Sequence, residues 1–178
     1  MDPPCLAPYG DRLYLAWRGG PGNGRINLLR SLDGISWGDK ITLDLETAWG
    51  PALVSTASNL VLCWRGETAD NRLNIMVSSD GHTFRNRRVL QERTTSGPAL
   101  TNWMGRPMLS WAGVGNRLLN VLEGRETGDF QDVRWGGKIT WPETCTGTPV
   151  IAKLGYDLAL AWTGTDGRLN TMLYPVAL

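Results

Sequence analysis

Residues 51–92 read PALVSTASNLVLCWRGETADNRLNIMVSSDGHTFRNRRVLQE, and this stretch decides the fold. It contains four short runs of strand-forming residues, separated by Ser-Asn, by a GETADN loop and by an SSDG turn. Alternation of side chains with a period of two is typical of a β-strand, and the separators are turn-forming residues. The stretch is therefore expected to form four short strands joined by turns.

The same pattern recurs four times along the chain. In each copy a Trp follows a Pro by 13 residues, and an Asn follows that Trp after 8 to 10 residues. The anchors are Pro4, Pro51, Pro98 and Pro149, then Trp17, Trp64, Trp111 and Trp162, then Asn27, Asn74, Asn120 and Asn170. Anchors that recur in the same order predict a repeat protein.

The strand that ends in the repeated Trp is apolar on both faces. Leu13, Leu15 and Trp17 alternate with Tyr14 and Ala16. A sheet covered on both faces, with four strands in about 47 residues, is typical of a propeller blade. The sequence predicts an all-β protein, a β-propeller of four such blades in which the last blade lacks its outer strand.

The predicted organisation is one domain over residues 1–178, with blades at about 4–50, 51–97, 98–148 and 149–178. Two closures are open at this point. The chain forms a small four-bladed ring, or a homo-oligomer completes a larger propeller, since an unfinished blade leaves an edge that can take a partner.

Two turns carry a family resemblance. SLDGISW at 31–37 and SSDGHTF at 78–84 resemble the Asp-box of sialidases and related BNR-repeat propellers, including lectin-like ones, and each follows the Asn-bearing strand. The resemblance implies structural roles for Asp33, Trp37, Asp80 and Phe84, in which the Asp bonds turn amides and the aromatic ring packs into the blade. GRETGDF at 124–130 is interpreted as a degenerate third copy.

Sialidase activity would imply an arginine triad, a Tyr–Glu nucleophile pair, an Asp acid/base and about six blades. The chain shows no Arg-Ile-Pro sequence and under four complete blades. Because a fold does not carry a function with it, we expect no catalytic residues and no enzyme activity.

Composition excludes several classes of function. The balance of 18 basic and 17 acidic residues gives no reason to expect nucleic acid or an anionic membrane as a partner. The single His and three Cys without ligand spacing predict neither a metal site nor a cofactor. No signal peptide and no long apolar segment is recognised, so a soluble protein of unknown compartment is expected.

The candidate ligand-binding residues lie in or beside the loops after the second strand and the connections between blades. These segments share one face of a propeller, and they carry Arg18, Arg25, Trp49, Arg65, Arg72, Arg117 and Arg168. Guanidinium groups offer several donors in a fixed geometry, and a Trp ring can stack on the apolar face of a sugar. The alternative interpretation is structural: the Asn bonds nearby backbone and the Arg covers the blade edge. Trp17, Trp64, Trp111 and Trp162 are predicted to pack between blades.

Three functions are weighed. The first is a non-catalytic, lectin-like propeller that binds a glycan or another hydroxylated ligand at repeated sites. The second is a scaffold for protein partners, without sugar binding. The third, less favoured, is a sialidase-type hydrolase or a part of one.

Overall fold

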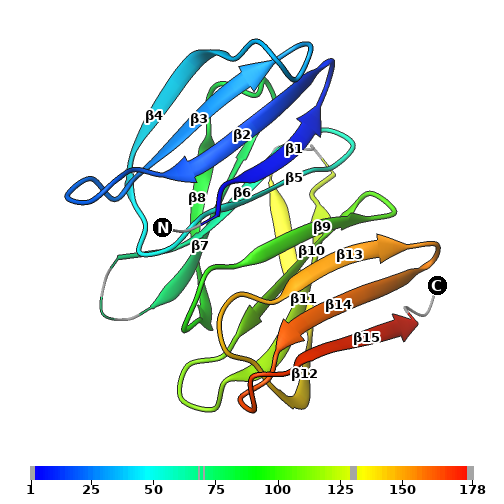
Figure 1. Ribbon diagram of the computed structural model, residues 1–178. Coiled ribbons are helices and arrows are strands. Elements are labelled where there is room, and N and C mark those ends of the chain that lie inside the picture. Colours follow the sequence, from blue (N-terminus) through cyan, green and yellow to red (C-terminus); the bar gives the residue numbers. More distant parts are fainter. Residues whose placement is uncertain (1–2, 68, 70, 129–131, 176–178) are drawn as a thin grey trace.

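The computed structural model describes residues 3–67, 69, 71–128 and 132–175 of the chain, and every regular element in them is a β-strand. The strands form four antiparallel sheets in sequence order, as Figure 1 shows. The all-β fold and the four propeller blades are therefore confirmed.

Each sheet is built from consecutive strands, with the first strand innermost. Blade 1 consists of β1 (Cys5–Tyr9), β2 (Arg12–Arg18), β3 (Arg25–Ser31) and β4 (Gly38–Glu46). Blade 2 consists of β5 (Ala52–Ser55), β6 (Leu60–Arg65), β7 (Arg72–Ser78) and β8 (Arg85–Arg93). Blade 3 consists of β9 (Ala99–Trp103), β10 (Arg106–Ala112), β11 (Leu118–Glu126) and β12 (Val133–Thr144).

Blade 4 has three strands, β13 (Val150–Leu154), β14 (Asp157–Thr163) and β15 (Leu169–Pro175). In the three complete blades the outer strand supplies a partner for the repeated Asn. Thr42 and Thr140 donate to Asn27 and Asn120 at 2.8 and 2.7 Å, and Arg87 donates to Asn74 at 3.1 Å. Within the described residues, blade 4 lacks the fourth strand, as the sequence predicted.

Every blade presents two different faces to its neighbours. We call the face that carries the Leu-x-Leu-x-Trp pattern of the second strand the front face, and the opposite one the back face. Three hydrophobic clusters fill the junctions between blades 1 and 2, 2 and 3, and 3 and 4. At each junction the front face of the later blade packs on the back face of the earlier one. At the first junction, for instance, Leu62 and Trp64 meet Tyr14, Ala16 and Ile26.

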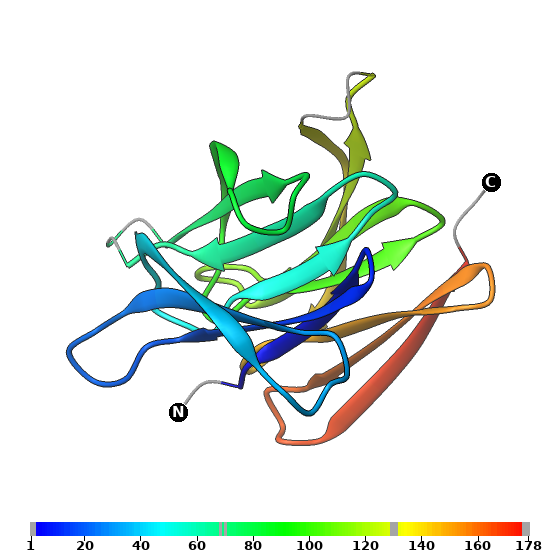
Figure 2. The same cartoon turned by 90° about the horizontal axis from the view of Figure 1, so that it is seen from above.

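The four blades form an open arc. The innermost strands β1, β5, β9 and β13 follow one another around the axis, each packed on the next. Among the described residues no hydrophobic cluster joins blade 4 to blade 1. Figure 2 shows these two blades at the two ends of a fan. The small four-bladed ring is thus not formed within one chain.

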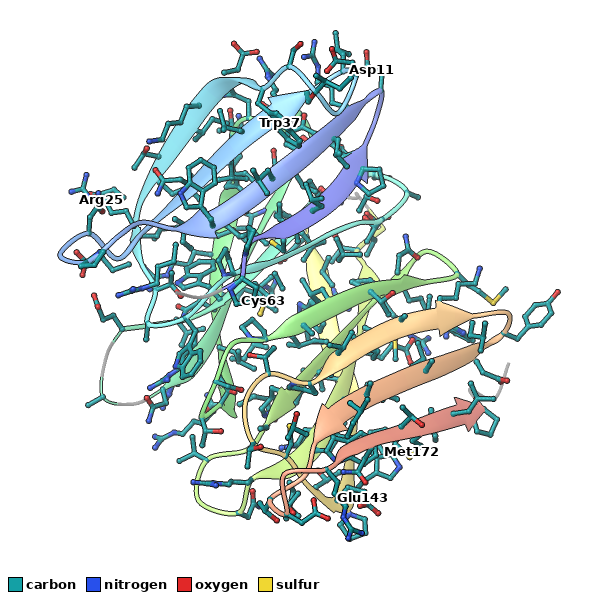
Figure 3. The ribbon with its side chains drawn as sticks, in the orientation of Figure 1. Asp11, Arg25, Trp37, Cys63, Glu143 and Met172 are labelled. Atoms are coloured by element: carbon teal, nitrogen blue, oxygen red, sulfur yellow. The ribbon has the colours of Figure 1, made fainter. Side chains whose placement is uncertain are left out.

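The propeller axis has two ends, and different loops gather at each of them. At one end, which we call the loop end, lie the loops after the second strands and the connections between blades. At the other, the hairpin end, lie the turns after the first strands and the Asp-box turns. Figure 3 shows the two ends on blade 1, where Arg25 marks the loop end and Asp11 the hairpin end.

The turns at 31–37 and 78–84, which resemble Asp-boxes and are called Asp-box turns for that reason, are held by their carboxylates. Oδ1 of Asp33 accepts the backbone N–H groups of Ile35 and Ser36 at 2.8 and 2.7 Å. Oδ1 of Asp80 accepts those of His82 and Thr83 at the same two distances. These bonds close each turn, while Gly34 and Gly81 take a positive φ that other residues avoid.

The equivalent turn of blade 3 differs from the sequence interpretation. In blade 3, Trp135 pairs with Gly124, which is the register position that Trp37 and Phe84 hold in the first two blades. The aromatic position is therefore taken by Trp135, after a longer turn. Phe130, the aromatic residue of the GRETGDF interpretation, lies outside the described residues.

Candidate ligand-binding groove

Arg18 and Arg65 hold the connections between blades. Nε of Arg18 donates to the carbonyl oxygen of Thr47 at 2.7 Å. Nη1 of Arg65 donates to the carbonyl oxygen of Thr95 at 3.3 Å, and its Nε donates to Asn71 at 3.1 Å. Burial lowers the pKa of Arg65. Each guanidinium group thus donates to one backbone carbonyl at the loop end, and that of Arg65 also donates to the side chain of Asn71.

Arg25 and Arg72 flank a groove at the junction of blades 1 and 2. Nη2 of Arg25 lies 3.1 Å from Oδ1 of Asp44 on the outer strand of blade 1. Arg72 lines the groove itself, which has a volume of about 470 Å³. We call this space the inter-blade groove; it is lined by Asp44, Leu45, Glu46, Trp64, Gly66, Glu67, Arg72, Asn74, Arg87 and Val89.

The groove brings both signs of charge together. Asp44, Glu46 and Glu67 supply carboxylates, and Nη2 of Arg18 reaches within 3.9 Å of Glu67 from behind the groove. A hydrogen bond with the neighbouring Glu67 carboxyl, and then repulsion by its charge, raises the pKa of Glu46. Both residues line the same groove, one from each blade.

The apolar part of the groove is aliphatic. The guanidinium carbon of Arg87 lies 5.7 Å from the centroid of the Trp64 ring, and Trp64 is almost fully buried. That ring is therefore a wall of the junction and is not free to stack on a sugar. Leu45 and the exposed Val89 supply the apolar contact surface.

The acidic set is not repeated around the arc. Register places Gln91 and Arg93 of β8 where blade 1 has Asp44 and Glu46. In blade 3, Val114 occupies the loop position that Glu67 has in blade 2. Sequence analysis predicted repeated sites, one for each blade. That prediction stays untested. The cluster of carboxylates and guanidinium groups described here lies at the junction of blades 1 and 2.

The remaining arginines stay apart from this groove. Arg117, in the loop before β11, is exposed and has a φ of 56°, and Nε of Arg168 lies 3.7 Å from Asp166 within its own loop. The repeated Asn has a structural role in every blade, since its Nδ2 donates to a backbone carbonyl two residues earlier.

Trp49 lies elsewhere, in a cleft along the propeller axis. This axial cleft, of about 510 Å³, is bounded by the first residues of all four innermost strands and by their repeated prolines. Its lining is mainly apolar, and the described lining residues include no Asp or Glu. Trp49 is therefore separate from the arginines with which the sequence grouped it.

Two features are absent from the described residues. No group of three or more His, Cys, Asp or Glu side chains is placed to hold a metal ion. No helix long and apolar enough to cross a membrane is present there either.

Sequence comparison finds no matching family model and no matching curated protein. Structure comparison gives clear matches. An α-L-arabinofuranosidase from Clostridium thermocellum matches with a TM-score of 0.64 at 14% identity, over 97% of this chain and 68% of that chain.

A lectin gives a match of similar quality. The Aleuria aurantia lectin in complex with Fucα1-6GlcNAc matches with a TM-score of 0.65 at 10% identity, over 97% of this chain and 58% of the lectin. A β-1,3-galactosidase bound to galactodeoxynojirimycin has a TM-score of 0.63 at 12% identity, over 97% of this chain and 72% of that chain.

These matches define the class of protein as a β-propeller. At such low identities the likeness extends to the fold alone. The matched proteins named here are glycoside hydrolases and a lectin that act on or bind sugars, and each is longer than the arc formed by this chain.

Proposed function

We propose that this chain is a non-catalytic, lectin-like carbohydrate-binding propeller whose ligand occupies the inter-blade groove. One observation carries the proposal: three carboxylates and two guanidinium groups line one open groove of about 470 Å³ beside aliphatic surface. Carboxylates accept hydrogen bonds from sugar hydroxyls, and guanidinium groups donate to neighbouring oxygens in a fixed geometry. Val89 and Leu45 would contact the C–H face of the sugar.

The comparisons support the ligand class at the level of the fold. The fucose-binding lectin shows that a propeller of similar geometry can serve as a sugar-binding module, and the hydrolases bind sugars on the same framework. The relationship to Asp-box sialidases stays a prediction that rests on the two turns.

A glycan array on the labelled chain, followed by calorimetric titration of the best ligand, tests the proposal. Glu67→Gln and Arg72→Gln should each weaken binding at least tenfold, because each removes a charged hydrogen-bonding partner worth about 1.5–3 kcal/mol. Arg134→Gln is the matched control, since it changes an exposed charge on β12 of blade 3, away from the groove, and it should leave affinity unchanged. Wild-type affinity in both groove variants would place the ligand elsewhere.

Hydrolysis at the same groove is the second candidate, and the close Glu46–Glu67 pair favours it. Glycosidases use two carboxyl groups, one of which has a raised pKa. A panel of fluorogenic glycosides, sialosides included, distinguishes the two functions. Release of the fluorophore that Glu46→Gln abolishes would make the chain an enzyme. Binding without release supports the lectin role.

A further inference from the structure

The two ends of the arc expose faces that every other blade buries. Leu169 lies on the back face of blade 4 and is 76% exposed. Its counterparts in blades 1, 2 and 3 are Ile26, Leu73 and Leu119, and each is 0% exposed. Each counterpart immediately precedes the repeated Asn, so the four positions are equivalent in the chain.

Two further apolar side chains of the blade 4 back face are exposed. Val150 and Leu173 are exposed by 61% and 53%. The register places them beside Ala161 and Ala159 on one surface of the sheet, together with Thr171. In the inner blades such a surface of small and aliphatic residues receives the next blade.

The front face of blade 1 is likewise exposed where the front face of blade 2 is buried. Leu6 is 57% exposed, whereas its counterpart Leu53 in blade 2 is 4% exposed. Leu13, Leu15 and Trp17 are only half-buried, whereas Leu60, Leu62 and Trp64 of blade 2 have lost nearly all their exposed surface. The difference arises because blade 2 has a preceding blade and blade 1 has none.

These two end faces are complementary to each other. The chain contains three examples of how a front face seats on a back face. Blade 1 carries the same Leu-x-Leu-x-Trp pattern on its front face. On the back face of blade 4, Ala161 and Leu169 match the small and aliphatic residues of the inner blades, whereas Thr171 stands where those blades have a large aliphatic residue. Burial of contiguous apolar surface favours association, and exposed patches of this kind mark interaction sites.

We propose that a second copy of this chain covers both end faces, head to tail. The front face of blade 1 in one copy seats on the back face of blade 4 in the other, as it does at the internal junctions. Two such junctions related by a two-fold axis close a ring of two chains. Eight blades in total remain within the range of four to eight that is typical of propellers.

Each junction joins two different faces, so each face can be blocked by its own substitution. Leu6→Asp blocks the front face and Leu169→Asp blocks the back face, and both side chains are exposed in the single chain, so neither change should disturb folding. The control is Ile35→Asp, because Ile35 is 84% exposed on an Asp-box turn and lies on neither end face. Light scattering coupled to size-exclusion chromatography measures the mass, and circular dichroism checks the fold.

The wild type and the Ile35→Asp control are expected at twice the chain mass of 19.6 kDa. Each blocked variant should run at the mass of one chain. An equimolar mixture of the two blocked variants should regain the dimer mass, because the intact back face of one still meets the intact front face of the other.

Several results would overturn the proposal. A wild type at the mass of one chain, at the highest soluble concentration, would show that a second copy does not cover these faces. A single blocked variant that stayed dimeric would show contact between like faces. A mixture that stayed monomeric, while the wild type is a dimer, would also contradict the head-to-tail arrangement.

Discussion

Nε1 of Trp103 lies 2.7 Å from the carbonyl oxygen of Tyr156 and joins the hairpin ends of blades 3 and 4. The same relationship occurs at the first junction, where the hydroxyl of Tyr9 lies 2.8 Å from the carbonyl oxygen of Ser58. Tyr9 and Trp103 are equivalent in the repeat, as are Ser58 and Tyr156. An aromatic donor at the end of the innermost strand thus fixes the following blade.

Trp103→Phe should destabilise the protein by about 2–3 kcal/mol. The change removes one hydrogen bond, worth about 1 kcal/mol, and leaves a cavity at a side chain that is 1% exposed. Urea unfolding measures the loss. The matched control is Trp37→Phe, the same change in a half-buried Asp-box ring, and it should cost less than half as much. Equal losses would show that the bond to Tyr156 contributes nothing.

Glu126 performs a similar task between blades 2 and 3. It occupies the repeat position of Asp33 and Asp80, but its Oε1 accepts from Nδ2 of Asn59 at 2.8 Å and from the backbone N–H of Ser58 at 3.3 Å. The hydroxyl of Thr56 also donates to this oxygen. The acid at this repeat position of blade 3 thus binds the first hairpin of blade 2.

Glu126→Ala should therefore destabilise the protein by about 2–3 kcal/mol, since it leaves the buried donors of Thr56 and Asn59 without this acceptor. Glu126→Gln keeps one oxygen and should cost about 1 kcal/mol. Glu143→Ala, on an exposed site visible in Figure 3, is the control and should lie within about 0.5 kcal/mol of the wild type. A Glu126→Ala variant as stable as the control would contradict the role in joining the blades.

The repeat made the architecture predictable. Period-two alternation, turn residues and the recurring Pro, Trp and Asn are local signals, and they place four blades and the missing outer strand. The opening of the arc is different, because it depends on the angle at which one blade packs on the next. No local pattern in the chain encodes that angle, so both closures remained open from sequence alone.

The candidate groove was predicted only in part. Arg72 lines it, whereas Arg25 and Arg18 only pair with two of its acids, Asp44 and Glu67. The sequence missed Glu46 and Glu67, because they come from different blades and no repeat marks them. A usable signal was present: these acids break the repeat, with Arg93 and Val114 at the next copy. The sequence also could not show that Arg18 and Arg65 bind backbone carbonyls, which depends on how connections fold over the loops.

The Asp-box turns should make stability depend on pH in the acidic range. Hydrogen bonds from the backbone amides of Ser36 and Ile35, and then from Ser31, hold the pKa of Asp33 well below its usual range. Partial burial of Asp80 opposes the same effect, but the amides of Thr83 and His82 outweigh it and its pKa is also lowered. A lowered folded-state pKa contributes stability that is complete above the unfolded value of about 3.9 and is lost as pH falls toward the folded value.

Asp80→Asn should therefore lower the melting temperature at pH 7 and reduce its fall between about pH 4 and pH 2. Asp157→Asn, at a half-buried position on the hairpin of blade 4, is the control and should retain the wild-type slope. Melting temperatures at several pH values measure the effect. A wild-type slope in Asp80→Asn would contradict the contribution of this carboxylate.

The three cysteines should be unreactive in the folded protein. All three are free thiols, and burial raises the pKa of Cys5 to about 12 and also raises the pKa of Cys63 and Cys145. Because the thiolate is the nucleophile, labelling by a disulfide reagent at pH 8 should be slow. The same reagent should titrate three thiols in guanidinium chloride. Rapid labelling of a native cysteine would show that its strand opens.

Two substitutions beside Glu46 should change its pKa in opposite directions. Glu67 raises the pKa of Glu46 through a hydrogen bond and through charge repulsion, while the nearby Arg25 lowers it. Glu67→Gln should therefore lower the pKa of Glu46 toward its ordinary value, and Arg25→Gln should raise it further.

Carboxyl carbon chemical shifts followed by NMR titration measure both changes, with Glu143 as an internal reference that should not move. If both variants shifted Glu46 in the same direction, a change of local structure rather than charge would be responsible. The same titration with a bound glycan would show whether affinity follows the ionised form of Glu46, as expected if its carboxylate accepts a hydrogen bond from the ligand.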